Sequence, residues 1–92
     1  MKVLKRNGSL QDFDIEKIRY SIANASDSIR KPLTEGDLHA LSKEVLGALG
    51  KKGEDTVRFD ELHKLVVGAL RDTGFYDVAQ EYDASELSKV NG

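Results

Sequence analysis

The chain has 92 residues and no cysteine, which excludes disulfides, thiolate metal sites and a cysteine nucleophile. Hydrophobic residues make up 39% and charged residues 33%, a balance typical of one soluble globular domain and too apolar for a disordered chain. The net charge of −2 argues against non-specific nucleic-acid binding. The charge is unevenly spread, with a net +2 over residues 1–20 and a net −4 over residues 72–92. We therefore expect the N-terminal end to attract anions.

The stretch "VLKRNGSLQDFD" predicts a β-hairpin. Asn7-Gly8 is a strong hairpin signal, because both residues tolerate the positive φ of a type I′ turn. We predict strands over about residues 2–6 and 9–13. Lys5 and Arg6 stand directly before the turn, and neighbours on a regular strand point to opposite faces. The two side chains can share one phosphate only if the strand breaks into its turn there, or if they hold it from different sides.

Two helices are predicted next. Asp14 can cap the first one, and Pro32 blocks its continuation. Its apolar stripe consists of Ile15, Ile18, Ile22, Ala25 and Ile29. Thr34 and Asp37 have the spacing of a capping box for the second helix, which we expect to stop at Gly50. Its stripe consists of Leu38, Leu41, Val45 and Leu49.

The second half of the chain predicts a short strand and two further helices. Val57 marks the strand. The third helix has the stripe Leu62, Leu65, Val66, Ala69 and Leu70. Gly74 suits its C-terminal cap, and a fourth helix begins at about Phe75. The expected architecture is α+β, a small N-terminal hairpin capping a four-helix bundle, as a single domain over residues 1–92.

Several kinds of chemistry are excluded by pattern. Neither glycine-rich phosphate-loop motif is present. His39 and His63 fall on different predicted helices with no metal-ligand spacing, and the carboxylates occupy polar helix positions rather than catalytic ones. We therefore expect no enzyme and no metal site within the protein. No run reaches the roughly 20 apolar residues of a membrane helix and no secretory signal is present, so a cytoplasmic location is expected.

With hairpin, cap and helix in place, "VLKRNGSLQDFDIEKIRYSI" resembles the opening of an ATP-cone. This regulatory nucleotide-binding module occurs in ribonucleotide reductases and in the bacterial repressor of reductase genes. The matching positions are Val3, Lys5, Arg6, Asn7, Gly8, Phe13, Asp14, Lys17 and Ile18. "VRFDELHKLVVGAL" and "GFYDVAQEY" resemble later parts of the family, so the likeness covers about residues 2–82 and leaves 83–92 as a helix end and tail.

The resemblance implies a hairpin lid over four helices, with ATP or dATP and Mg²⁺ bound between lid and helices. Lys5 and Arg6 would hold the phosphates, next to Asn7 of the same motif, and Lys17 would add charge near the start of the first helix. The resemblance also implies that Val3 and Ile18 line the base or the sugar. Gln11 and Asp14 would face the ribose or orient the basic residues. His63 falls where some ATP-cones have a histidine that contacts the ligand.

Each of these residues has a plainer interpretation. Lys5, Arg6 and Lys17 can be solvated surface charges, and Asp14 can be only a helix cap. Val3 and Ile18 are core residues first. His63 can be an ordinary helix histidine.

The leading hypothesis is a non-catalytic regulatory domain that couples ATP or dATP to self-association or to a partner such as ribonucleotide reductase. Tyr82 and Leu87, with no following element to cover them, suggest a homo-oligomer. The alternative is a degenerate ATP-cone that acts as a protein-interaction module, suggested by the acidic residues after Tyr82, where the family commonly has basic ones. A nucleic-acid-binding domain is the third class. The chain is either free-standing or a piece of a longer protein.

Overall fold

The N-terminal hairpin belongs to a three-stranded mixed sheet, whose third strand comes from between the second and third helices. The computed structural model describes the backbone of residues 1–91 and the side chains of residues 1–85. Strands β1 (Lys2–Leu4), β2 (Leu10–Asp12) and β3 (Thr56–Arg58) lie in the order β2-β1-β3. β1 pairs with β2 in antiparallel and with β3 in parallel orientation. The expected hairpin and third strand are confirmed, although each hairpin strand is shorter than predicted.

The turn between β1 and β2 differs from the predicted type I′ turn. Gly8 has a φ of 85°, but Asn7 does not, since Arg30 is the one non-glycine residue at positive φ among those described. The Gly8 N–H donates to the Lys5 carbonyl at 3.0 Å, and the Lys5 N–H donates to the Ser9 carbonyl at 2.8 Å. The turn therefore has Arg6 and Asn7 at its centre and Gly8 at the position that requires positive φ, a common three-residue hairpin connection. The Asn7 Oδ1 accepts bonds from the Ser9 N–H and hydroxyl, which accounts for Asn7 without a left-handed backbone.

Helices α1 (Ile15–Ser28) and α2 (Glu35–Lys52) begin at the predicted caps. The Asp14 carboxylate accepts from the Glu16 N–H at 3.0 Å, and Thr34 and Asp37 make both bonds of a capping box. The predicted stop at Gly50 is wrong, because α2 continues to Lys52 and ends with Gly53 at a φ of 64°. A glycine inside a helix costs only about 1 kcal/mol, whereas the left-handed end of a helix selects glycine strongly.

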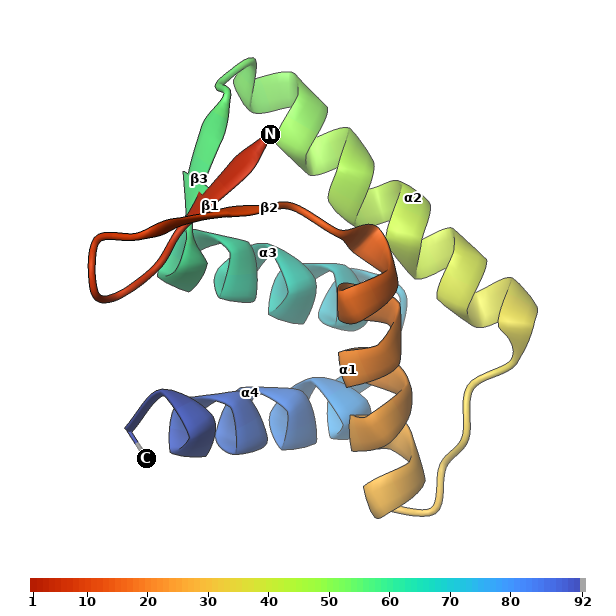
Figure 1. Cartoon of the computed structure of the whole chain (residues 1–92). Coiled ribbons are helices and arrows are strands. Elements are labelled where there is room, and N and C mark those ends of the chain that lie inside the picture. The colour runs from red at the N-terminus through yellow and green to blue at the C-terminus, as the bar shows by residue number, and fades with distance from the viewer. Residues whose placement is uncertain (92) are drawn as a thin grey trace.

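Helices α3 (Phe59–Asp72) and α4 (Tyr76–Asn91) are joined by a tight turn and lie side by side in opposite directions (Figure 1). Gly74 has a φ of 89° and its N–H donates to the Arg71 carbonyl at 3.0 Å. The Phe75 N–H donates to the Leu70 carbonyl at 2.8 Å. These two bonds make a Schellman motif, which confirms the predicted glycine cap and reverses the chain direction.

The core lies between the four helices and one face of the sheet. Its buried apolar residues are Ile22, Ala25, Leu38, Leu41, Val45, Leu49, Val57, Leu62, Val66, Val67, Ala69, Leu70, Val78, Ala79 and Tyr82. Tyr82 is only 4% exposed, so the expectation that it lies uncovered on the last helix is wrong: it packs into the core of its own chain. Leu87 lies outside the residues whose side chains the structure describes. None of the described helices is both long and apolar enough to cross a bilayer.

Replacing Arg30 with glycine is expected to stabilise the protein. Arg30 follows the C-cap residue of α1 and has a φ of 58°, and the N–H groups of Arg30 and Lys31 donate to carbonyls of the last turn of α1. A side chain in this left-handed conformation costs about 1 kcal/mol relative to glycine. We expect Arg30→Gly to raise the melting temperature by roughly 4–8 °C, measured by circular dichroism. Arg30→Ala removes the same charge but keeps a Cβ, so an equal rise in Arg30→Ala would contradict this account.

Candidate functional site

Two cationic side chains lie on the hairpin loop. β1 ends at Leu4, so Lys5 begins the turn and Arg6 occupies its second position. This is the break in the strand that a shared phosphate contact requires. The Lys5 N–H still donates to the Ser9 carbonyl, as in a strand. Because side chains alternate along a strand, the Lys5 side chain lies on the same side of the sheet as Val3. Both cationic side chains are exposed.

The inner face of the sheet carries two further residues named by the sequence. Val3 lies opposite Gln11 on β2 and opposite Val57 on β3, and such cross-strand neighbours share a face. Val57 is buried and Val3 packs against the core, so this face is turned toward the helices. Gln11, on the edge strand β2, is exposed. The structure thus brings Val3 and Gln11 side by side, below the loop that carries Lys5.

The outer face of the sheet is occupied differently. Lys2 forms an ion pair with Asp12, its neighbour in the register. The hydrogen bond and the charge of Lys2 lower the pKa of the Asp12 carboxyl from its ordinary value. Lys2 is therefore engaged on the side of the sheet away from Val3 and Gln11.

The start of α1 supplies the next three candidates. The Asp14 side chain caps the helix, as expected, and the Asp14 carbonyl accepts from the Lys17 N–H at 3.1 Å. Lys17 is exposed, and Ile18 is half-buried against the core. Within residues 1–85, neither Lys5 nor Lys17 forms an ion pair through its side chain, so both ammonium groups remain available to an anion.

His63 on α3 is not the freely exposed histidine of the plainer interpretation. Its side chain is 19% exposed, and its Nε2 lies 2.6 Å from the Asp83 Oδ1 on α4. Its ring also stacks on Tyr82, with centroids 5.5 Å apart and planes at 22°. Sequence reasoning missed Asp83 as a partner. No local pattern in the sequence marks this pair, because it depends on how α3 and α4 pack.

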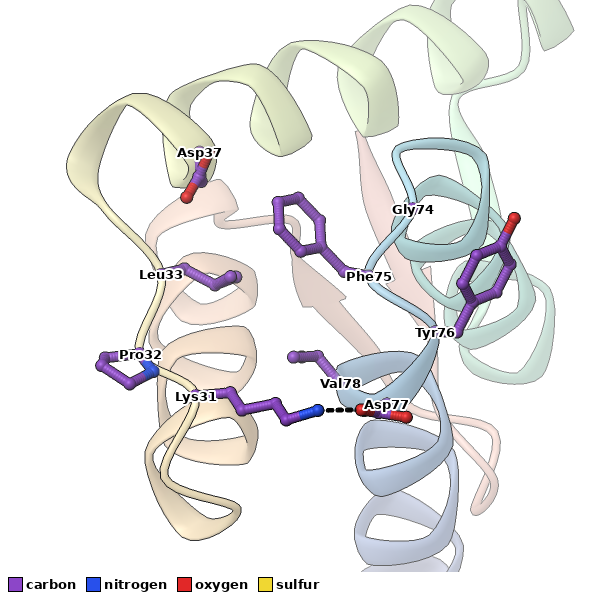
Figure 2. Close-up of a pocket in the computed structure, with 9 residues that line it drawn as sticks. All are labelled: Lys31, Pro32, Leu33, Asp37, Gly74, Phe75, Tyr76, Asp77 and Val78. Carbon is purple, nitrogen blue, oxygen red and sulfur yellow. Dashed lines mark hydrogen bonds and ion pairs between the residues drawn. The ribbon is translucent and has the colours of Figure 1, made fainter.

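Two shallow hollows lie elsewhere on the surface. The first, of about 320 Å³, lies between the α1–α2 connection and the start of α4, and Figure 2 shows Lys31 reaching across its edge to Asp77. The second, of about 380 Å³, adjoins the same ion pair. None of the site residues named by the sequence lines either hollow. Lys31 is already paired with Asp77, so its ammonium group is not available to an anion bound in either hollow.

The mixed sheet, the four helices and the loop with its two cationic residues agree with one family of domains. The model of the ATP cone domain family matches residues 1–84. The chain belongs to the ATP cone domain family. ATP cones are regulatory, non-catalytic modules that bind ATP or dATP, so this ATP cone is a nucleotide-binding regulatory module. A comparison with curated proteins found no match.

Proposed function

We propose that this ATP cone binds ATP or dATP with Mg²⁺ between its hairpin and the starts of α1 and α3, without catalysing a reaction. The observation that carries the proposal is the placement of Lys5 and Arg6 at the turn of the hairpin, in the stretch that resembles the opening of an ATP-cone. Arg6 can bind phosphate oxygens with its planar fork and Lys5 as a point charge. Lys17, exposed on the first turn of α1, adds positive charge where the helix N-terminus already favours anions.

The remaining candidates suit the nucleoside part and the support of the loop. Val3 and Ile18 are half-buried apolar residues that can contact the base or the sugar. Gln11 lies beside Val3 on the same face of the sheet. Asp14 precedes Lys17 by one helical turn. Gln11 and Asp14 can each accept or orient hydrogen bonds of a ribose. Asn7 holds the loop through its bonds with Ser9, which keeps Lys5 and Arg6 in place. His63 would reach a phosphate from α3.

Binding would regulate association, with itself or with a partner such as ribonucleotide reductase, in the cytoplasm. A nucleotide can do this only if its affinity differs between the associated and free states. Tyr82 is buried and gives no interface. Tyr20, Leu46 and Tyr76 are large apolar side chains that remain exposed, and they are the residues we assign to such a contact.

A second candidate function is a protein-interaction module that has lost nucleotide binding. The pairing of His63 with Asp83 favours it, because a carboxylate of the same chain occupies a side chain that the resemblance assigns to the ligand. The hairpin favours the nucleotide-binding function, since two adjacent cationic residues at the turn are not needed for a protein-interaction module that binds no nucleotide.

Titration calorimetry with ATP and dATP, with and without Mg²⁺, tests the proposal. We expect saturable heat for both nucleotides and a weaker response to AMP, which lacks the outer phosphates. At a nucleotide concentration one hundred times Kd, stability should rise by about 2.7 kcal/mol, which corresponds to roughly 10–20 °C in melting temperature for a domain of this size. No heat and no melting shift at millimolar nucleotide would reject the proposal in favour of the interaction module. Retention of DNA at moderate salt would instead support the nucleic-acid class.

A further inference from the structure

The contact between His63 and Asp83 links the proposed nucleotide site to α4. It joins a side chain of α3 to one on α4 at 2.6 Å, and the histidine is the less exposed partner, at 19% against 44%. The ring is held from a second direction by stacking on Tyr82, which is buried. His63 is therefore held from two directions by residues of α4.

The same contact occupies the Nε2 of His63. An ionised carboxylate only accepts hydrogen bonds, so the Nε2 of His63 donates the hydrogen in this pair. While Asp83 accepts that hydrogen bond, Nε2 is not available to a phosphate oxygen.

We propose that Asp83 restrains nucleotide binding in this ATP cone by competing with phosphate for His63. The inference rests on the proposed function, and it adds a regulatory residue that is not among the site residues named by the sequence. Binding of a triphosphate to His63 breaks the bond to Asp83 and disturbs the stacking on Tyr82. Since Tyr82 and Asp83 are adjacent on α4, this exchange transmits nucleotide binding to that helix.

Asp83 opposes the nucleotide in two ways that act in the same direction. Its bond to His63 must be broken, and its negative charge lies one hydrogen bond from the ring that the phosphates approach. Asparagine at this position keeps the shape and an accepting oxygen, but the bond loses its charge assistance, which is about half of its strength. Asp83→Asn therefore weakens the competitor without removing the contact on which local packing depends.

The test compares MgATP affinity by calorimetry in the wild type, Asp83→Asn and Asp77→Asn. Asp77→Asn is the matched control, because it removes the same charge from the same helix at a carboxylate paired with Lys31 instead of His63. We expect Asp83→Asn to bind MgATP about tenfold more tightly than the wild type, which is equivalent to ~1.4 kcal/mol. Asp77→Asn should stay within about twofold of the wild type. Equal or weaker binding by Asp83→Asn, or the same gain in Asp77→Asn, would overturn the inference.

A second measurement separates this inference from the proposed function. Long-range ¹H–¹⁵N spectra of the His63 ring report which nitrogen carries the hydrogen and what it contacts. We expect MgATP to shift the Nε2 resonance of His63 together with the amide of Asp83. If calorimetry shows binding while both resonances stay unchanged, the proposed function stands and the competition fails. If neither the wild type nor Asp83→Asn binds MgATP at millimolar concentration, the proposed function fails and the inference with it.

Discussion

Replacing Lys5 and Arg6 together with alanine is expected to abolish detectable nucleotide binding while leaving the fold intact. Both side chains are exposed on the hairpin loop. The backbone hydrogen bonds of the turn join main-chain atoms of Lys5 to those of Gly8 and Ser9, and alanine keeps these atoms. A charge-assisted bond to phosphate contributes ~1.5–3 kcal/mol, so the loss of two such bonds should weaken affinity by roughly two to four orders of magnitude. Calorimetry with MgATP measures this loss directly.

Stability without ligand provides the control for that experiment. Exposed charges contribute about 0–1 kcal/mol each, so the double variant should keep a melting temperature close to that of the wild type and lose the rise caused by ATP. A second double variant, Lys43→Ala with Lys51→Ala, removes the same charge from exposed positions on α2. It should bind nucleotide as the wild type does. If the hairpin variant binds MgATP as tightly as the wild type, its cationic loop is only a solvated turn.

Replacing Leu70 with alanine is expected to have the largest effect on stability. Leu70 is fully buried on α3, and its carbonyl accepts the Phe75 bond of the turn into α4. Truncation of a buried leucine costs about 2–5 kcal/mol, because apolar contacts are lost and a cavity remains. A domain of this length has a stability of roughly 5–14 kcal/mol, so urea unfolding should show a loss of a large part of it.

Leu10→Ala makes the same chemical change at a different kind of position. Leu10 is 59% exposed on the edge strand β2 and loses little contact when truncated. We expect a change within about 0.5 kcal/mol. Equal losses in the two variants would mean that Leu70 does not lie in the core described above.

The elements that local chemistry determines were the predictable part of the fold. Asp14, the box of Thr34 with Asp37, and Gly74 act on backbone groups within a few residues, and all three caps are confirmed. The end of α2 was predicted wrongly because Gly50 and Gly53 could each have ended the helix, and only Gly53 adopts the left-handed conformation. The turn type was predicted wrongly because Asn7 stabilises the turn through the hydrogen bond that its side chain accepts from the Ser9 N–H. Its backbone does not adopt the positive φ that a type I′ turn requires.

Long-range contacts were the unpredictable part of the site. Lys5, Arg6 and Lys17 belong to one local motif, and their exposure follows from the hairpin and the first helical turn. The partner of His63 depends on how α3 and α4 pack, and no local pattern marks Asp83 as different from the other acidic residues of the last helix. The burial of Tyr82 has the same cause, since only the packed helices show that the chain covers it.

The most direct test of the central claim is a titration of the ¹⁵N-labelled protein with MgATP, followed by amide chemical shifts. Binding at the hairpin predicts saturable shifts of the loop amides from Lys5 to Ser9, of Lys17 and of His63, with small changes beside the Lys31–Asp77 ion pair. Shifts confined to the hollows around Lys31 and Asp77 would contradict the location of the site. A spectrum unchanged at millimolar MgATP would contradict nucleotide binding itself.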